Sequence, residues 1–160
     1  MNSQSDQSSM IINRSMPPGA IIPELAYDDI DTAVDWLTKT FGFKERLRIR
    51  NHRSQLVFDQ ASVIVIAQTG ESASHTPDVA AFQPLKSEAT HSIMVRVAEI
   101  DRHYEHVKQC GARILHPPET YPFGERQYTV EDLGGHRWTF TQSVADVAPE
   151  DWGGQLVSSL

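Results

Sequence analysis

The feature that most constrains this chain is an internal repeat. Residues 22–31 (IPELAYDDID) align with residues 92–101 (SIMVRVAEID), and each copy predicts a strand that runs directly into a helix. Further extended segments follow each helix, so each half of the chain predicts a βαβββ module. A single module of this kind leaves one face of its sheet bare, and two modules must therefore cooperate.

Start and stop signals bound both predicted helices. In the first copy Asp29 or Asp31 can cap the helix and Gly42 ends it, whereas in the second Asp101 caps and Gly111 ends it. The predicted fold class is α+β, with two βαβββ modules in one chain. We expect them to form a curved, incomplete barrel around a central cavity, with the helices outside.

Composition divides the chain further. The first twenty residues are rich in Ser, Gln and Asn and end in Pro-Pro-Gly, a composition that buries too little apolar surface to offset ordering entropy. A Ser-, Thr-, Ala- and Pro-rich stretch separates the copies, and it could cover the cavity or act as a passive linker. The predicted divisions are a disordered N-terminal tail (1–20), a domain (21–142) made of module one (21–67), a linker (68–90) and module two (91–142), and a C-terminal tail (143–160).

Charge and composition exclude several classes of partner. The formal net charge is -7, and the 14 Lys and Arg residues are scattered rather than clustered, which argues against nucleic acid. No apolar run approaches the roughly 20 residues of a spanning helix, so no membrane partner is predicted. The single cysteine, Cys110, cannot form an internal disulfide, and the N-terminus lacks the pattern of a signal peptide. We therefore expect a cytoplasmic protein.

Three motifs carry a resemblance to a known family. They are the Asp-x-Asp-helix-Phe-Gly-Phe segment at 29–43, its repeat ending in Cys110-Gly-Ala, and the Glu-Asp-x-x-Gly-x-x-Trp pattern at 131–138. Together they resemble the vicinal oxygen chelate superfamily of glyoxalase I, extradiol dioxygenases, fosfomycin-resistance enzymes and bleomycin-binding proteins. Residues 121–128 (YPFGERQY) are most similar to single-chain members of the bleomycin-resistance and PhnB-like type. The resemblance implies a homodimer, although the internal duplication also makes a monomer feasible.

The resemblance also implies where metal ligands would lie, near the start of each module's first strand and the end of its last. These positions hold Ile22, Ser92 and Thr139, and the fourth, within 62–66, has no strong ligand. Neutral hydroxyls and isoleucine do not hold a divalent ion, so neither a metal nor another cofactor is predicted. His91 is the alternative ligand, but strand alternation places it on the helix side.

The same alternation predicts which side chains face the cavity. Arg96 and Arg137 could clamp a carboxylate or phosphonate, or they could neutralise Glu24 or Glu131. Histidines on the second helix, including His103, are expected on its solvated face. The predicted ligand-binding residues are Glu24, Ser92, Met94, Arg96, Gln127, Thr129, Arg137 and Thr139.

These residues favour a protein that binds a small organic molecule in the barrel cavity without the usual metal. The alternative is a lyase, isomerase or dioxygenase of the vicinal oxygen chelate type. It would use Glu24 as a candidate base with Arg96 as electrostatic stabiliser, or a displaced metal site that includes Glu24 or His91. A third reading is a non-catalytic interaction domain whose cavity is filled by side chains.

Overall fold

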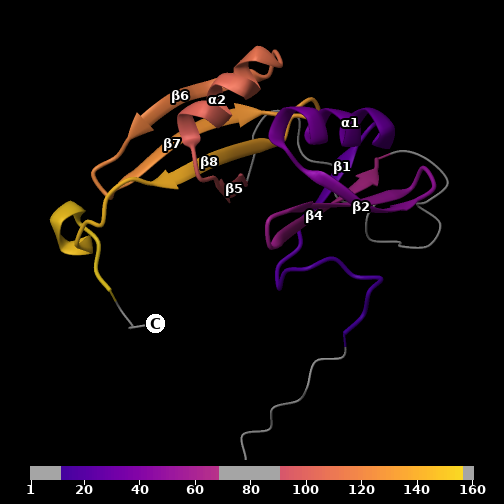
Figure 1. Ribbon diagram of the computed structural model, residues 1–160, viewed down its shortest axis with the longest axis horizontal. Helices are drawn as coiled ribbons and strands as arrows, with labels where there is room; N and C mark the ends of the chain where they lie inside the picture. Colours follow the sequence, from indigo (N-terminus) through magenta and orange to yellow (C-terminus); the bar gives the residue numbers. More distant parts are fainter. Residues whose placement is uncertain (1–11, 69–90, 157–160) are drawn as a thin grey trace, which may run out of the picture.

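The computed structural model describes residues 12–68 and 91–156 of the 160-residue chain. Figure 1 shows the two helices lying together above two separate sheets. The elements in chain order are β1 (Glu24–Tyr27), α1 (Ile30–Phe41), β2 (Lys44–Ile49), β3 (Arg53–Phe58), β4 (Ala61–Ala67), β5 (Ile93–Arg96), α2 (Ile100–Gln109), β6 (Arg113–Thr120), β7 (Glu125–Glu131), β8 (Arg137–Ser143) and the 3-10 helix η3 (Pro149–Trp152).

The two sheets repeat one topology. Sheet A has the strand order β1-β4-β3-β2, and sheet B has the order β5-β8-β7-β6. In each sheet the first strand of the module is parallel to its last strand, and the remaining pairs are antiparallel. The described residues form no closed barrel, so the prediction of two βαβββ modules in a curved, incomplete barrel is confirmed.

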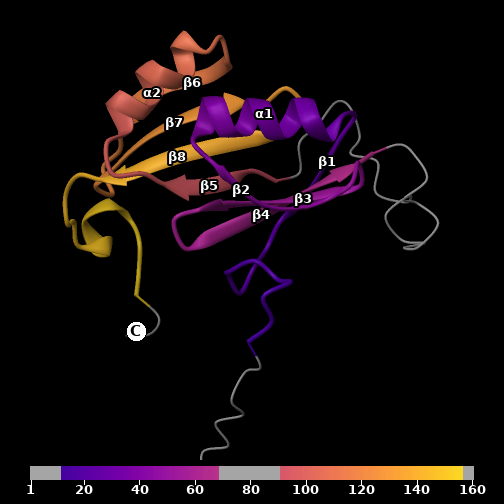
Figure 2. The ribbon, with the colours of Figure 1, turned by 45° about the vertical axis from the view of Figure 1, so that its right-hand side comes forward.

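One hydrophobic core joins the modules, and both helices contribute to it. The ring of Phe41, at the end of α1, lies 5.2 Å from Trp138 and 5.0 Å from Phe140 in edge-on contacts with sheet B. Helix α1 therefore packs against both sheets, and Figure 2 shows it beside α2 on the same side of the molecule. Alternate strand residues such as Leu25 and Val95 point to this core, as strand alternation predicts.

Helix α1 is capped as the sequence predicts, whereas α2 is not. The Asp29 carboxylate accepts a hydrogen bond from the Thr32 backbone N–H at 2.7 Å, and Gly42 follows the helix with a φ of 90°. The N-cap of α2 is Glu99 rather than Asp101, and its side chain makes no capping bond. The Gln142 side chain, from β8, accepts from the first N–H of α2 at 2.8 Å instead. A long-range partner replaces the local cap.

Two histidines of α2 contact α1. His106 is exposed, as the sequence predicts, whereas His103 is partly buried, so the prediction of a solvated face was wrong for His103. The Nε2 of His103 donates to the Phe41 carbonyl at 3.0 Å, and the Nε2 of His106 donates to the Lys39 carbonyl at 2.8 Å. Because a carbonyl only accepts, His103 Nε2 carries the proton and Nδ1 accepts from the Tyr128 hydroxyl at 2.6 Å. Burial lowers the pKa of His103, which favours this neutral ring.

Strand β6 runs through Pro117 and Pro118 to Thr120. Proline lacks a ladder donor and is uncommon in the interior of a sheet. β6 is the edge strand of sheet B, and its pairing with β7 is irregular on either side of His116. An irregular edge strand accommodates both prolines.

The described parts of the two predicted tails both contact the sheets. Side chains of sheet A donate to backbone carbonyls of residues 14–18, where the sequence predicts a loose tail up to residue 20. At the other end, Trp152 of η3 lies 5.6 Å from the Phe123 ring. Residues 1–11, 69–90 and 157–160, which include almost all of the predicted linker, lie outside the described residues. Among those described, no helix has the length and apolarity needed to cross a bilayer.

Candidate ligand-binding face

Each sheet has one face turned to the common core, and we call the opposite side its open face. On sheet B, Trp138 and Phe140 belong to the core, so Thr139 and Thr141 between and beyond them lie on the open face. The strand register places Met94 beside Thr139 and Arg96 beside Thr141. The open face of sheet B is therefore polar except for Met94, whose side chain is 61% exposed.

Seven of the eight predicted ligand-binding residues gather at this face. Six lie on strands of sheet B, Ser92 immediately precedes β5, and only Glu24 belongs to sheet A. The placement agrees with the predicted alternation, while a role in binding stays a prediction. The seven are Ser92, Met94, Arg96, Gln127, Thr129, Arg137 and Thr139.

Hydroxyl and amide groups link the middle of this face. The Gln127 amide nitrogen donates to the Thr141 hydroxyl at 3.2 Å, and the hydroxyls of Thr129 and Thr139 lie 3.4 Å apart. These contacts fix the side chains across β7 and β8 while leaving part of each group's hydrogen-bonding capacity free. The face can therefore hydrogen-bond a polar molecule laid across it.

The charged end of the face contains a residue that sequence reasoning missed, Glu125. Its carboxylate lies 3.6 Å from the Arg96 guanidinium and accepts from the Ser143 hydroxyl at 3.0 Å. The second carboxylate oxygen, Oε2, is buried without a partner among the described residues. Strand alternation from Gln127 would have placed Glu125 on this face, although its partner could not be read from the sequence.

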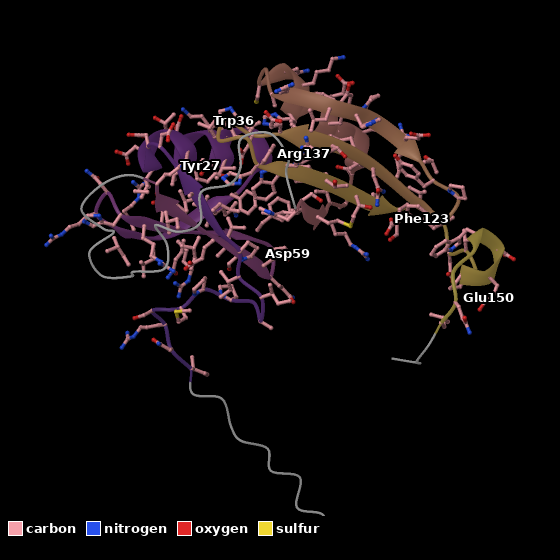
Figure 3. The ribbon with its side chains drawn as sticks, turned by 180° about the vertical axis from the view of Figure 1, so that it is seen from behind. Tyr27, Trp36, Asp59, Phe123, Arg137 and Glu150 are labelled. Atoms are coloured by element: carbon pink, nitrogen blue, oxygen red, sulfur yellow. The ribbon has the colours of Figure 1, made fainter. Side chains whose placement is uncertain are left out.

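The arginines do not pair with the acids that the sequence suggested. Arg96 approaches Glu125, and Glu131 pairs with Arg113 at 3.1 Å. Arg137 forms no ion pair within 12–68 and 91–156, although it lies opposite Glu131 in the register. Figure 3 shows Arg137 on the ribbon of β8. The Arg96 side chain is 74% exposed, so it remains accessible to an anion from solution.

Glu24 lies apart from the sheet B residues, and its surroundings do not match those of the predicted base. Its carboxylate pairs with the Arg53 guanidinium on the open face of sheet A. The side chain is 42% exposed, so it does not lie in the partly apolar enclosure that general bases use. Arg53 reaches Glu24 from β3, and the role of Glu24 as a base stays a prediction.

An aromatic cluster flanks the charged end of the face. The rings of Tyr121 and Phe123 stack with centroids 5.3 Å apart, and Phe123 contacts Trp152 of η3. The Tyr121 backbone N–H donates to the Glu125 carbonyl at 2.8 Å, so the cluster adjoins the Arg96–Glu125 pair. In Figure 3 Phe123 is labelled close to η3. Flat apolar groups of a ligand could stack here.

A cavity of about 520 Å³ lies beside Arg96, between the modules. Phe41, Phe58 and Val97 provide apolar walls, and Arg102 contributes charge at the rim. Of the eight predicted ligand-binding residues, only Arg96 lines it. This cavity is therefore separate from most of the open face of sheet B.

The residues present do not fit the metal site of the wider family. Ile22, Ser92 and Thr139 supply no carboxylate or imidazole, and His91 is exposed at the end of β5. Within the described part of the chain, no three His, Cys, Asp or Glu side chains come together as a metal site.

A duplicated βαβββ chain with a polar open face defines a class of proteins that is recognised by fold. The profile of the Glyoxalase/Bleomycin resistance protein/Dioxygenase superfamily matches residues 20–140, and the chain belongs to this superfamily. The resemblance inferred from the sequence motifs is thereby confirmed.

Individual relatives agree with this membership. TioX from Micromonospora sp. ML1 is 35% identical, and the match covers 77% of this chain and 97% of TioX with a TM-score of 0.61. A glyoxalase/bleomycin resistance protein/dioxygenase from Nocardioides is 20% identical over 88% of this chain and 91% of its own, with a TM-score of 0.67, and shows the shared fold. An uncharacterised protein of Mycobacterium bovis is 25% identical over 136 residues, which are 80% of this chain and 86% of that protein.

Proposed function

We propose that this protein binds a small organic anion on the open face of sheet B, without the family's metal. The observation that carries the proposal is Arg96, an exposed guanidinium on the same face as the hydroxyl and amide groups of β7 and β8. Guanidinium groups bind carboxylates and phosphonates through paired N–H donors. The neighbouring aromatic cluster adds surface for the apolar part of such a molecule.

The spacing of the two arginines favours an elongated ligand. Arg96 lies opposite Thr141, four positions along β8 from Arg137. At about 3.3 Å a residue, their Cα atoms are roughly 13 Å apart along the strands. A molecule that contacts both would extend over Met94 and Thr139, between them.

A second copy of the chain would enclose this ligand. Met94 and Arg96 are strongly exposed, so the described chain leaves the β5 side of this face uncovered. Binding sites for small molecules bury most of the ligand, and an open sheet face does not do so by itself. We therefore include a homodimer in the proposal, with the face covered by the partner subunit.

The enzymatic alternative gains no support from Glu24. A base needs a position near the bound molecule, and no described contact brings Glu24 to the sheet B residues. Arg53 also forms a direct ion pair with the Glu24 carboxylate. A binding role needs only the side chains already placed on the open face of sheet B, whereas a catalytic role also needs a base that has not been assigned.

A ligand screen followed by matched arginine variants tests the proposal. Small aromatic carboxylates and phosphonates are screened for a rise in melting temperature, and the affinity of each hit is measured for the wild type, Arg96→Ala and Arg113→Ala. Arg96 and Arg113 are equally exposed at 74%, and each pairs with a glutamate of β7, but Arg113 lies on the far edge strand.

We expect Arg96→Ala to weaken binding about tenfold or more, because a charge-assisted contact contributes roughly 1.5–3 kcal/mol. Arg113→Ala should bind like the wild type. Equal affinities for all three proteins would contradict the assignment of Arg96. Binding of one equivalent of Ni, Mn, Fe or Zn by protein purified without chelator would contradict its metal-free part.

A further inference from the structure

The open face of sheet A is covered by the chain's own N-terminal residues. Figures 1 and 2 show this indigo stretch on the side of sheet A away from α1. Three side chains beneath it, Gln55, Ser62 and Ile64, are only 4%, 2% and 3% exposed. Ile64 does not belong to the hydrophobic core, so its burial comes from the other face of the sheet. Residues 12–19 are called the cover segment below.

The sheet holds the cover segment by its backbone carbonyls. Gln55 Nε2 donates to the Ser15 carbonyl at 2.9 Å, and the Ser62 hydroxyl donates to the Pro18 carbonyl at 2.7 Å. Arg46 donates to the Arg14 carbonyl at 2.6 Å through one guanidinium nitrogen. Its other terminal nitrogen donates to the Gln55 side-chain oxygen at 2.6 Å, which orients the Gln55 amide.

The hydrogen bonds from sheet A go to the main chain of the cover segment, and Pro17 is the one residue of this segment that is buried. All three acceptors on the segment are carbonyl oxygens, and all three donors are side chains of β2, β3 and β4. Within the segment, Asn13 accepts from the Ser15 N–H at 3.0 Å and bends the chain. A peptide with the same turn and the same carbonyl spacing could make the same bonds.

We propose that the open face of sheet A is a peptide-binding surface and that the cover segment is its built-in competitor. The partner that fits is a peptide with a turn like that of residues 13–16, whose carbonyls replace those of Arg14, Ser15 and Pro18. The covalent connection gives the segment an effective concentration near the millimolar range, so an external peptide binds weakly until the segment leaves. This surface is separate from the anion site on sheet B, and either proposal can fail without the other.

Cutting the cover segment from the folded protein tests the inference directly. A protease site is inserted between Gly19 and Ala20, the protein is cut after folding, and the released peptide is removed by dialysis. A fluorescent peptide with the sequence of residues 12–19 is then titrated into cut and uncut protein. Cutting after folding avoids a truncated chain that fails to fold, and an unchanged circular dichroism spectrum confirms that the sheets persist.

We expect the peptide to bind the cut protein at least tenfold more tightly than the uncut protein. Gln55→Ala in the cut protein should weaken binding several-fold, whereas Arg113→Ala on sheet B should not change it. Arg14→Ala in the peptide should also have little effect, since only its carbonyl is bound. Equal binding by cut and uncut protein, or no binding by either, would overturn the inference.

Hydrogen exchange on the uncut full chain gives an independent test. Replacing Gln55 or Ser62 by alanine removes one donor each, so backbone amides of residues 14–16 should exchange several-fold faster. The Arg113→Ala variant should leave these rates unchanged. Rates that stay the same in both donor variants would show that the sheet does not hold the segment.

Discussion

At the scale of single residues, Asp132 ties the modules together more than any predicted site residue does. Its buried carboxylate accepts from the Tyr27 hydroxyl at 2.6 Å and from the Trp138 indole at 2.9 Å. It also accepts from the Gly134 and His136 backbone N–H groups, which shape the turn before β8. Burial and the charge of Asp132 both raise the pKa of Tyr27, so the phenol stays protonated and donates.

Replacing Asp132 by alanine should destabilise the protein by about 3 kcal/mol or more, because buried donors lose a charged acceptor. Urea unfolding of Asp132→Ala and the wild type measures this loss. Asp146→Ala, at an exposed position after β8, should lower the free energy of unfolding by less than about 0.5 kcal/mol. Similar small losses for both variants would contradict the role assigned to Asp132.

The sequence predicted the face on which these side chains lie, but not the partners that they contact. Strand alternation placed Met94, Thr129 and Thr139 on the open face, because a two-residue period follows from covalent geometry alone. It could not predict that Arg96 pairs with Glu125 or Glu24 with Arg53, since long side chains choose partners by tertiary position. Local patterns fix a side chain's face but not its neighbour.

At the scale of elements, α2 is joined to α1 by His103. Its neutral ring donates to Phe41 and accepts from Tyr128, and burial lowers its pKa below the usual value of about 6.5. A lowered folded-state pKa means that the unfolded chain binds this proton first. The stability contributed by the neutral ring is therefore present above about pH 6.5 and is lost as the pH falls toward the folded-state pKa.

The variant His103→Gln removes this titration. The difference in free energy of unfolding between wild type and His103→Gln should be largest near pH 7.5 and should shrink toward pH 5. Urea titrations at several pH values measure it. A difference that is constant over this range would show that His103 does not change its protonation on unfolding.

The segment after β8 is held against Gly124. A Cβ at Gly124 would lie 2.3 Å from the Ala145 carbonyl oxygen, and the Gly124 carbonyl accepts from the Val144 N–H at 2.8 Å. Gly135 has the same φ of 84°, but a Cβ there meets nothing within 4 Å. The two glycines therefore share backbone strain and differ only in the contact.

Gly124→Ala should displace the segment that carries Trp152 from Phe123, whereas Gly135→Ala should not. Both variants carry roughly 1 kcal/mol or more of left-handed strain, which cancels in the comparison. Faster proteolysis after residue 143 and a red shift of tryptophan emission in Gly124→Ala alone would report the displacement. Matching behaviour in both variants would show that the close approach to Ala145 is not needed.

Element boundaries show what the sequence could and could not predict. The repeat predicted both modules and their strand-helix order. The cap at Asp29 could be predicted from the sequence as well, because its hydrogen bond is local. The first N–H of α2 is bonded by Gln142, more than forty residues away, and no local pattern indicates such a partner. Likewise β6 continues through Pro117 because it is an edge strand, a position that only the assembled sheet defines.

At the scale of the whole molecule, the open face of sheet B predicts association. If a second copy covers this face, light scattering should give a mass of twice 17.9 kDa. Met94→Asp places a charge on the covered surface and should shift the equilibrium toward the monomer. Leu133→Asp, on the turn between β7 and β8, should leave the mass unchanged. A monomer at high concentration would remove the partner subunit from the proposed site.

The most direct test of the ligand-binding proposal uses the methyl group of Met94 as a reporter on the open face. Protein labelled with ¹³C at its methionine methyls is titrated with the aromatic carboxylates and phosphonates that raise its melting temperature. We expect the Met94 resonance to shift on binding, the Met16 resonance on the cover segment to stay in place, and Arg96→Ala to abolish the shift. Binding that leaves the Met94 resonance unchanged, or that persists unchanged in Arg96→Ala, would place the ligand elsewhere than on the open face of sheet B.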